Sequence, residues 1–107
     1  MTVFNKDVEQ IDLGGGVSRK ILAHDSKMMC VEVKFKKGSV GALHSHPHEQ
    51  ISYVAEGKFE YEVEGEKYIL SKGDSYHTKP NTTHGVVALE DGILIDVFTP
   101  MREGFLK

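Results

Sequence analysis

The sequence contains a single cysteine, Cys30, among 107 residues. No intrachain disulfide can form, and a zinc site built only from thiolates is excluded. One isolated thiol suits a reducing compartment. The N-terminal stretch lacks the apolar core of a signal peptide, and no segment is apolar over enough residues to cross a bilayer. We therefore expect a cytoplasmic protein without membrane association.

Excess charge of one sign is also lacking. Thirteen basic and 16 acidic residues give a net charge of −3, and the lysines are scattered along the chain. A nucleic-acid-binding face needs clustered basic residues, so no nucleic-acid partner is expected. A hydrophobic content of 39% is typical of a globular protein. The length favours one domain, residues 1–107, with one modest core.

Sustained helical periodicity is missing as well. The chain instead shows short runs rich in β-forming residues, separated by turn residues such as Gly38, Gly57 and Gly73. Strands are expected at 17–23, 28–35, 40–46, 50–55, 59–63, 67–70, 84–89 and 93–98. This close spacing predicts an all-β sandwich or barrel. The glycines at 14–16 precede a β-like run rather than a helix, which predicts a turn and not a phosphate-binding loop.

The segment from residue 42 to residue 50 is rich in potential metal ligands. His44 and His46 are two residues apart on an expected strand, so their side chains should share one face. Paired imidazoles are poor core residues but good metal ligands. Pro47 interrupts the strand, Gln50 can return a carbonyl oxygen, and His84 can add an imidazole from a distant strand. The alternative is a set of surface histidines on a polar loop; the spacing favours a metal site.

These residues resemble the two sequence motifs of the cupin superfamily. The first motif corresponds to Gly38, His44, His46, Gln50 and Gly57, with Gln50 in the usual glutamate place. The second is looser and corresponds to Gly73, Pro80 and His84. The resemblance covers roughly residues 15–100. It implies a single-domain cupin, which is a double-stranded β-helix or jelly-roll barrel.

The cupin resemblance also implies one divalent metal ion, held by His44, His46, Gln50 and His84. Imidazole and oxygen ligands do not select among Zn, Ni, Mn, Fe and Co. Because all four ligands are neutral, the charge of the ion is not compensated by the protein. Such a site should favour an anionic substrate group.

An acidic residue interrupts the apolar run at 93–98. A buried carboxylate is costly, so Asp96 must be paired, bound or protonated. It shares a strand face with Leu94 and Phe98. Asp96 is expected either to form a salt bridge, inside the barrel or across a dimer, or to act as a general acid or base. Arg102 can clamp a carboxylate, the alternative being a surface arginine beside Glu103.

The runs at 44–57 and 85–103 resemble the KdgF family of small pectin-degradation cupins. The resemblance implies an isomerase-type enzyme that converts 4,5-unsaturated uronates, released from pectin or alginate, to the linear keto form. In this family the catalytic aspartate and the substrate-binding arginine match Asp96 and Arg102, with Phe98 beside the aspartate. His48 is interpreted as a residue at the mouth of the substrate site or as an exposed one. The substrate would be a small anionic sugar.

Two other functions are compatible with a metal-binding cupin: an iron-dependent dioxygenase and a non-catalytic sugar-binding module. A homodimer is also expected, because a small barrel can cover an apolar outer sheet by pairing. Among other residues, Met28, Met29 and Cys30 are expected in the core. Tyr76 and His77 lie close to the second motif and could reach the pocket.

Overall fold

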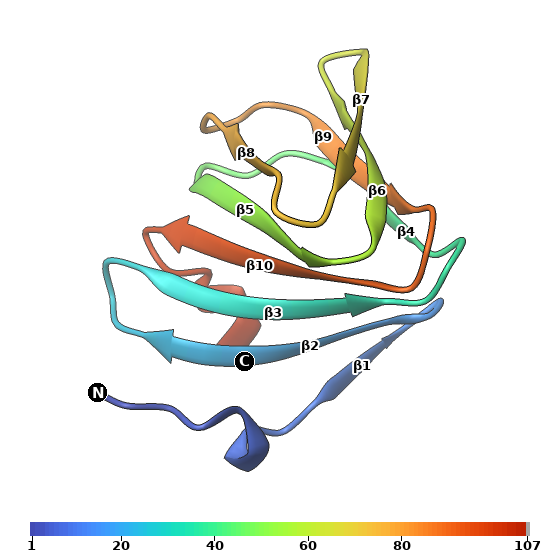
Figure 1. Ribbon diagram of the computed structural model, residues 1–107. Coiled ribbons are helices and arrows are strands. Elements are labelled where there is room, and N and C mark those ends of the chain that lie inside the picture. Colours follow the sequence, from blue (N-terminus) through green and yellow to red (C-terminus); the bar gives the residue numbers. More distant parts are fainter. Residues whose placement is uncertain (107) are drawn as a thin grey trace.

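The computed structural model describes residues 1–106, which form two antiparallel sheets that face each other (Figure 1). Neighbouring strands of the larger sheet run in the order β1 (Ile11–Gly14), β2 (Val17–His24), β3 (Met29–Phe35), β10 (Gly92–Thr99), β5 (Glu49–Glu56) and β8 (Ser75–Thr78). The smaller sheet has the order β4 (Val40–His44), β9 (His84–Ala88), β6 (Lys58–Val63) and β7 (Glu66–Ser71). Two short 3-10 turns, η1 (Asn5–Asp7) and η2 (Glu103–Leu106), lie near the ends of the chain.

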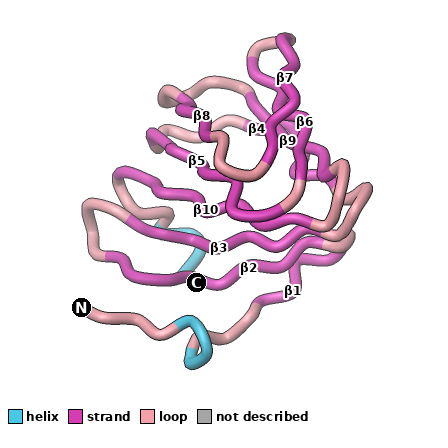
Figure 2. The backbone as a smooth tube through the Cα atoms, in the orientation of Figure 1, coloured by secondary structure: helices cyan, strands magenta, loops and turns pink. Residues whose placement is uncertain are grey.

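Most of the described backbone is strand, with helix confined to the two short 3-10 turns (Figure 2). The all-β prediction and the eight expected strands are confirmed, although β4 stops at His44 instead of continuing to residue 46. Strands β1 and β8 were not expected, because each has only four residues. The sequence SYHT is polar, and IDLG contains an aspartate and a glycine, which disfavour strands. Within residues 1–106, no helix is long and apolar enough to span a membrane.

The core lies between the two sheets. Strands β5 and β10 alternate buried and more exposed residues, as expected when one face of a sheet packs inward. The main cluster of buried apolar side chains comprises Phe35, Val54, Phe59, Tyr61, Val86, Ala88 and Leu94. A second cluster comprises Met29, Val31 and Phe98. Polar residues occupy the remaining inward positions of β5 and β10, so the interior is not uniformly apolar.

The register between β5 and β10 places the polar inward residues opposite one another. Ser52 pairs with Asp96, and Gln50 pairs with Phe98. All four residues are buried and share the inner face of the larger sheet. A shift of one residue would turn every one of them outward, so the register itself determines what faces the interior.

Two residues expected in the core lie elsewhere. Met28 precedes β3 and is 51% exposed. Cys30 alternates with the buried Met29 and Val31, so its side chain lies on the outer face, where it is half-buried. Burial raises the pKa of the Cys30 thiol, with Asp96 and Glu32 adding to the rise, which does not favour a thiolate nucleophile.

The turns at one end of the barrel require glycine. The predicted turn at residues 14–16 is confirmed as the hairpin that joins β1 to β2. Gly57, between β5 and β6, has φ +84°, and a Cβ there would lie 2.5 Å from the carbonyl oxygen of Asp91. This close approach holds the β5–β6 turn against the β9–β10 turn.

Candidate functional site

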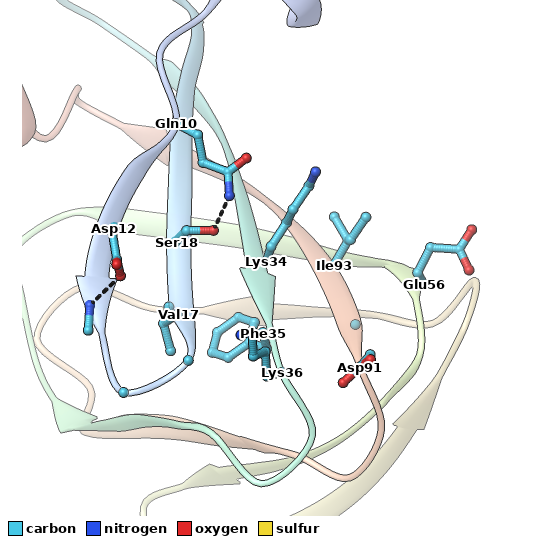
Figure 3. A pocket seen from close by; sticks show the side chains of 14 residues that line it. Gln10, Asp12, Val17, Ser18, Lys34, Phe35, Lys36, Glu56, Asp91 and Ile93 are labelled. Atoms are coloured by element: carbon cyan, nitrogen blue, oxygen red, sulfur yellow. Dashed lines mark hydrogen bonds between the residues drawn. The ribbon is translucent and has the colours of Figure 1, made fainter.

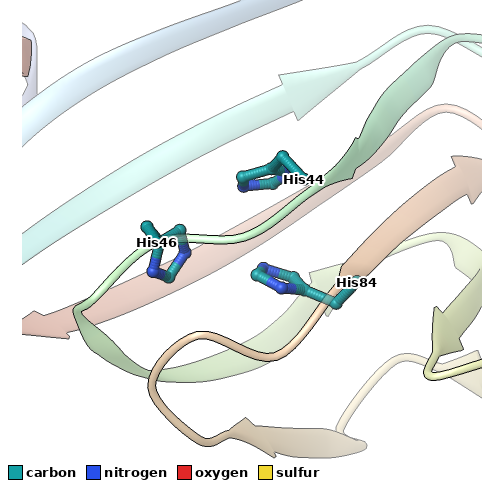
Figure 4. Close-up of side chains that lie close together, drawn as sticks. All are labelled: His44, His46 and His84. Carbon is teal, nitrogen blue, oxygen red and sulfur yellow. The ribbon is translucent and has the colours of Figure 1, made fainter.

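Three histidines meet at the other end of the barrel (Figure 4). His44 and His84 are paired directly across β4 and β9, and their ring centroids are 4.5 Å apart. His46 lies beyond the end of β4, so strand alternation is not the reason that it faces His44. The loop is held instead by the backbone amide of Asn81, which donates to the carbonyl of His46 at 2.7 Å. One nitrogen from each ring lies within 4.8 Å of the other two.

The three rings share one hydrogen-bonding arrangement. In each histidine, Nδ1 faces a backbone carbonyl two residues away: Ala42 for His44 (2.8 Å), His48 for His46 (3.0 Å) and Thr82 for His84 (2.9 Å). An Nδ1–H group that donates to a carbonyl leaves the lone pair on Nε2. The backbone therefore prepares all three Nε2 atoms to accept a cation.

His46 and Gln50 show an unusual contact. The Nε2 atom of His46 lies 3.1 Å from Oε1 of Gln50, while its Nδ1 atom already faces the carbonyl of His48. A neutral imidazole carries one N–H and cannot donate to both oxygens. Burial, together with Arg102 and His84, lowers the pKa of His46 to about 4, so the ring is neutral near pH 7. A cation shared by Nε2 and Oε1 would satisfy both atoms.

The orientation of the Gln50 amide is set by its neighbours. Gln50 Nε2 donates to Ser52 Oγ at 2.8 Å, so the amide oxygen faces His46. The Nε2 atom of His84 is buried and has no hydrogen-bond partner within the described part of the chain. Burial of an unsatisfied nitrogen is costly unless a ligand completes it. Three imidazole nitrogens and one amide oxygen therefore fit a divalent metal ion.

Asp96 lies next to this donor set. The residue is 8% exposed, and its carboxylate accepts a hydrogen bond from Ser52 Oγ at 2.6 Å. Burial raises the pKa of Asp96 to about 6, against the opposing effects of hydrogen bonds from Ser52 and Gln50 and of the positive charge of Arg102. No salt bridge to Asp96 is found in residues 1–106, so the expected internal salt bridge is not observed there.

A cavity of about 160 Å³ connects these groups. Its lining includes His44, Gln50, His84, Asp96, Phe98 and Arg102. Of the predicted site residues, His46 and His48 are not part of the lining. The structure therefore brings three of the four predicted donors, the acidic residue and the arginine to one hollow, and His46 adjoins it through the histidine cluster.

Arg102 turns toward the interior rather than pairing with Glu103. Its guanidinium carbon lies 5.1 Å from the ring centroid of Phe98 and 4.4 Å from that of Phe105. Burial is the main cause of its lowered pKa, Arg19 lowers it further, and Asp96 opposes the change. Arg102 is thus a partly desolvated cation at the cavity, a setting in which a guanidinium binds a carboxylate well.

The remaining histidines lie outside the cavity lining. The ring of His48 is 5.5 Å from that of His46, and its buried Nδ1 has no partner in the described chain. His77 lies on the outer face, where it pairs with Glu49. Tyr76 does reach the cavity and stacks on Tyr61 with a centroid distance of 3.8 Å.

Sequence reasoning missed two further interior residues, Arg19 and Ser52. Arg19 has the same strand parity as Val17 and Ile21, both of which pack on the core. This alternation in the sequence could have indicated that Arg19 faces the interior. Ser52 alternates with Gln50 on β5, but its importance depends on pairing with Asp96, which no local pattern reveals.

A larger hollow, of about 780 Å³, lies at the opposite end of β10, beside the glycine turn at 14–16 (Figure 3). Lysines and carboxylates alternate around it, as with Lys34, Lys36, Glu56 and Asp91. The carboxylate of Asp91 already accepts a hydrogen bond from the backbone amide of Lys37 at 2.8 Å. None of the predicted site residues lines this hollow, and its mixed charge selects no ligand class.

Comparison with known proteins agrees with this architecture. Residues 31–98 match the family model described as a cupin domain. The chain is 50% identical over 97 residues to the pectin degradation protein KdgF of Dickeya dadantii (strain 3937), covering 89% of this chain and 88% of that protein.

Solved structures are similarly close. The structure of KdgF from Halomonas sp. matches with a TM-score of 0.94 and 45% identity, covering 98% of this chain and 97% of that one. An RmlC-like cupin from Shewanella frigidimarina NCIMB 400 matches with a TM-score of 0.94 and 42% identity, covering 97% of this chain and 94% of that one. The expected jelly-roll barrel is confirmed. The chain therefore belongs to the cupin family and, within it, is a relative of the KdgF proteins.

Proposed function

We propose that this cupin converts 4,5-unsaturated uronates from pectin or alginate breakdown to the linear keto form. The observation that carries the proposal is the environment of Asp96. This buried carboxylate has no salt bridge in residues 1–106 and shares one cavity with metal-type donors and with Arg102. The 50% identity to a pectin degradation protein supports the same substrate class.

In this proposal one divalent ion is held by His44, His46, Gln50 and His84. These ligands do not select among Zn, Ni, Mn, Fe and Co. When bound, the ion supplies Lewis acidity that polarises the oxygens of the sugar. The four protein donors carry no charge of their own. The site as a whole therefore attracts a small anionic sugar.

The protein side chains divide the remaining tasks. Arg102 binds the carboxylate of the uronate, and the ring of Phe98 packs against the sugar beside it. His48, whose ring lies 5.5 Å from that of His46, contributes at the edge of the substrate site. Asp96, with its pKa raised to about 6, can both hold and release a proton near neutral pH.

The reaction is an isomerisation in which atoms balance. The bond between C1 and the ring oxygen breaks, and the C1 hydroxyl loses its proton as the aldehyde forms. The ring oxygen becomes the hydroxyl of an enol at C5. The enol loses this proton and gains one at C4, which gives the ketone, and Asp96 is the residue that transfers the proton at carbon.

Decay of the ultraviolet absorbance of the ring double bond tests this assignment. Asp96→Asn and Asp96→Ala should abolish conversion while the metal content stays at the wild-type level. Glu49→Gln is the matched control, because it removes a carboxylate on the outer side of β5 and should leave the rate unchanged. Conversion by Asp96→Asn at the wild-type rate, with metal retained, would refute the proposed role.

We also propose that the protein is a cytoplasmic homodimer. The outer face of the larger sheet carries Ile51 and Tyr53, which are 54% and 47% exposed. On the adjacent β10, Ile93, Ile95 and Val97 are half-buried on the same face. A second copy of the chain would remove this apolar surface from water.

A further inference from the structure

The cavity contains a second arginine that the proposed reaction does not use. Arg19 lies in the middle of β2 and pairs with Val33 of β3, a residue packed against the core. Arg19 therefore faces inward between Val17 and Ile21, which pack on the core. It lines the same cavity as Arg102 and Asp96.

The two guanidinium groups are close neighbours. The Cζ atom of Arg19 lies 3.7 Å from the ring centroid of Phe105, and that of Arg102 lies 4.4 Å from the same centroid. Their separation cannot exceed the sum of these two distances. Neither arginine belongs to a salt bridge within residues 1–106. Two cations this close, in a partly desolvated hollow, repel each other unless an anion lies between them.

No carboxylate of the described chain lies within salt-bridge distance of either guanidinium. Asp96 is the one acidic residue that lines the cavity within the described chain, and its Oδ1 already accepts from Ser52. The Nε atom of Arg19 is buried and has no hydrogen-bond partner there. Contact with Phe105 stabilises the cation through its ring face but cannot satisfy an N–H group.

We propose that Arg19 joins Arg102 in binding the carboxylate of the uronate, and that Arg19 makes the site select uronates over neutral sugars. The identity of the ligand rests on the proposed function. A carboxylate has two oxygens with about four lone-pair positions, so it can accept hydrogen bonds from both guanidinium groups. Phe105 keeps the two side chains at the cavity by contact with each.

Binding of a saturated hexuronate tests the inference without turnover. Dissociation constants for D-galacturonate and for neutral D-galactose are measured by NMR titration on the protein with its native metal. Arg19→Gln should raise the Kd for galacturonate about tenfold or more, because hydrogen bonds between charged groups are lost. The Kd for galactose should not change. Lys34→Gln, which removes an exposed positive charge on the neighbouring strand, should change neither value.

Two further variants separate binding from a purely structural role. Arg19→Lys keeps the charge but loses the planar fork, so the Kd for galacturonate should rise less than in Arg19→Gln. Phe105→Leu removes the ring that Arg19 contacts and reports the stability of that packing. If Arg19→Gln only lowered the thermal midpoint, as Phe105→Leu would, and kept the wild-type preference for galacturonate, the inference would be overturned. If Arg19→Gln does not fold, Arg19→Lys provides the test. An unchanged Kd for galacturonate in Arg19→Lys would then overturn the inference.

Failure of this inference is distinguishable from failure of the proposed function. Suppose that the wild-type protein prefers galacturonate to galactose, that Arg19→Gln loses this preference, and that the wild-type protein does not convert the unsaturated uronate. These results would contradict the proposed reaction and support the role of Arg19. Normal conversion with an unchanged KM in Arg19→Gln would contradict the role of Arg19 alone.

Discussion

Ser52 lies opposite Asp96 across β5 and β10, and its hydroxyl donates to the carboxylate at 2.6 Å. The same hydroxyl oxygen accepts from the Gln50 amide at 2.8 Å. Through this fully buried serine, the charge of Asp96 orients the amide oxygen of Gln50 toward His46. Asp96, Ser52 and Gln50 thus form one hydrogen-bonded chain, which ends at an oxygen of the donor set.

Removing the hydroxyl of Ser52 should weaken metal binding although Ser52 is not a ligand. In Ser52→Ala the Gln50 amide loses its fixed orientation, and outer-shell changes of this kind typically cost about 10–100-fold in metal affinity. Competition with a chelator measures the affinity. Ser39→Ala is the control, since Ser39 is also buried but bonds to the carbonyl of Lys36. Equal affinity in Ser52→Ala and wild type would contradict the relay.

Stability of the metal-free protein should depend on the titration of Asp96. Its pKa rises from 3.8 to about 6 on folding, which corresponds to about 3 kcal/mol. The folded state holds the proton more tightly, so this contribution is fully present below pH 4 and is lost as the pH rises through 6. Asp96→Asn should therefore be more stable than wild type at pH 7 to 8, by up to about 3 kcal/mol, with a smaller difference at pH 4. Urea unfolding of both proteins across this range provides the measurement, and identical pH profiles would contradict the raised pKa.

Metal content should depend on the clustered histidines and not on the outer one. His46→Ala removes a proposed ligand, so its loss of metal affinity should exceed the roughly 10–100-fold typical of outer-shell changes. His77→Ala removes an exposed imidazole that pairs with Glu49 and should keep the wild-type metal content. Elemental analysis after dialysis compares the two. Metal loss in His77→Ala, or full retention in His46→Ala, would place the ion elsewhere.

The glycine turns offer a test of the packing at the far end of the barrel. Gly57→Ala forces a Cβ against the carbonyl of Asp91, whereas Gly65→Ala meets no atom within 4 Å. Both residues have positive φ, a backbone conformation that costs about 1–2 kcal/mol for alanine. In Gly57→Ala only, the clash should lower the free energy of unfolding by roughly a further 1–3 kcal/mol. Thermal or urea unfolding distinguishes them, and equal losses of stability would show that the turns do not touch.

The proposed dimer depends on the outer face of the larger sheet. Ile51→Glu places a charge in that face and should shift the protein to monomers in sedimentation or light-scattering experiments. Ile69→Glu is the control, because Ile69 is equally exposed but lies on β7 of the other sheet. A dimer that persists in Ile51→Glu, or a monomeric wild type, would rule out this interface.

The sequence was most informative where residues form long runs of β-forming residues. Strands β3 and β10 follow from dense apolar and β-branched residues, and the alternation within β10 correctly placed Leu94, Asp96 and Phe98 on one face. The four-residue strands β1 and β8 are held in the sheet by their neighbours rather than by their own strand propensity. Local pattern alone could not identify them.

The sequence predicted that His44, His46 and His84 converge, and the structure shows it, but the sequence did not reveal the geometry that brings them together. His44 and His84 meet because β4 and β9 pair in register, and His46 joins them through a loop held by Asn81. Strand alternation predicted that His44 and His46 lie on one face. The two side chains do lie close together, but His46 is outside β4, so alternation is not the cause. Ser52 and Arg19 were missed because their importance arises only when distant strands come together.

The register between β5 and β10 has a consequence for how this chemistry can change over evolutionary time. Gln50, Ser52, Asp96 and Phe98 occupy successive inward positions on these two adjoining strands. Inserting or deleting a single residue in either strand would exchange the whole set for the side chains now facing solvent. Variants that keep this arrangement must therefore replace single side chains on an unchanged backbone, or alter the loops, because every second residue of these strands faces the interior.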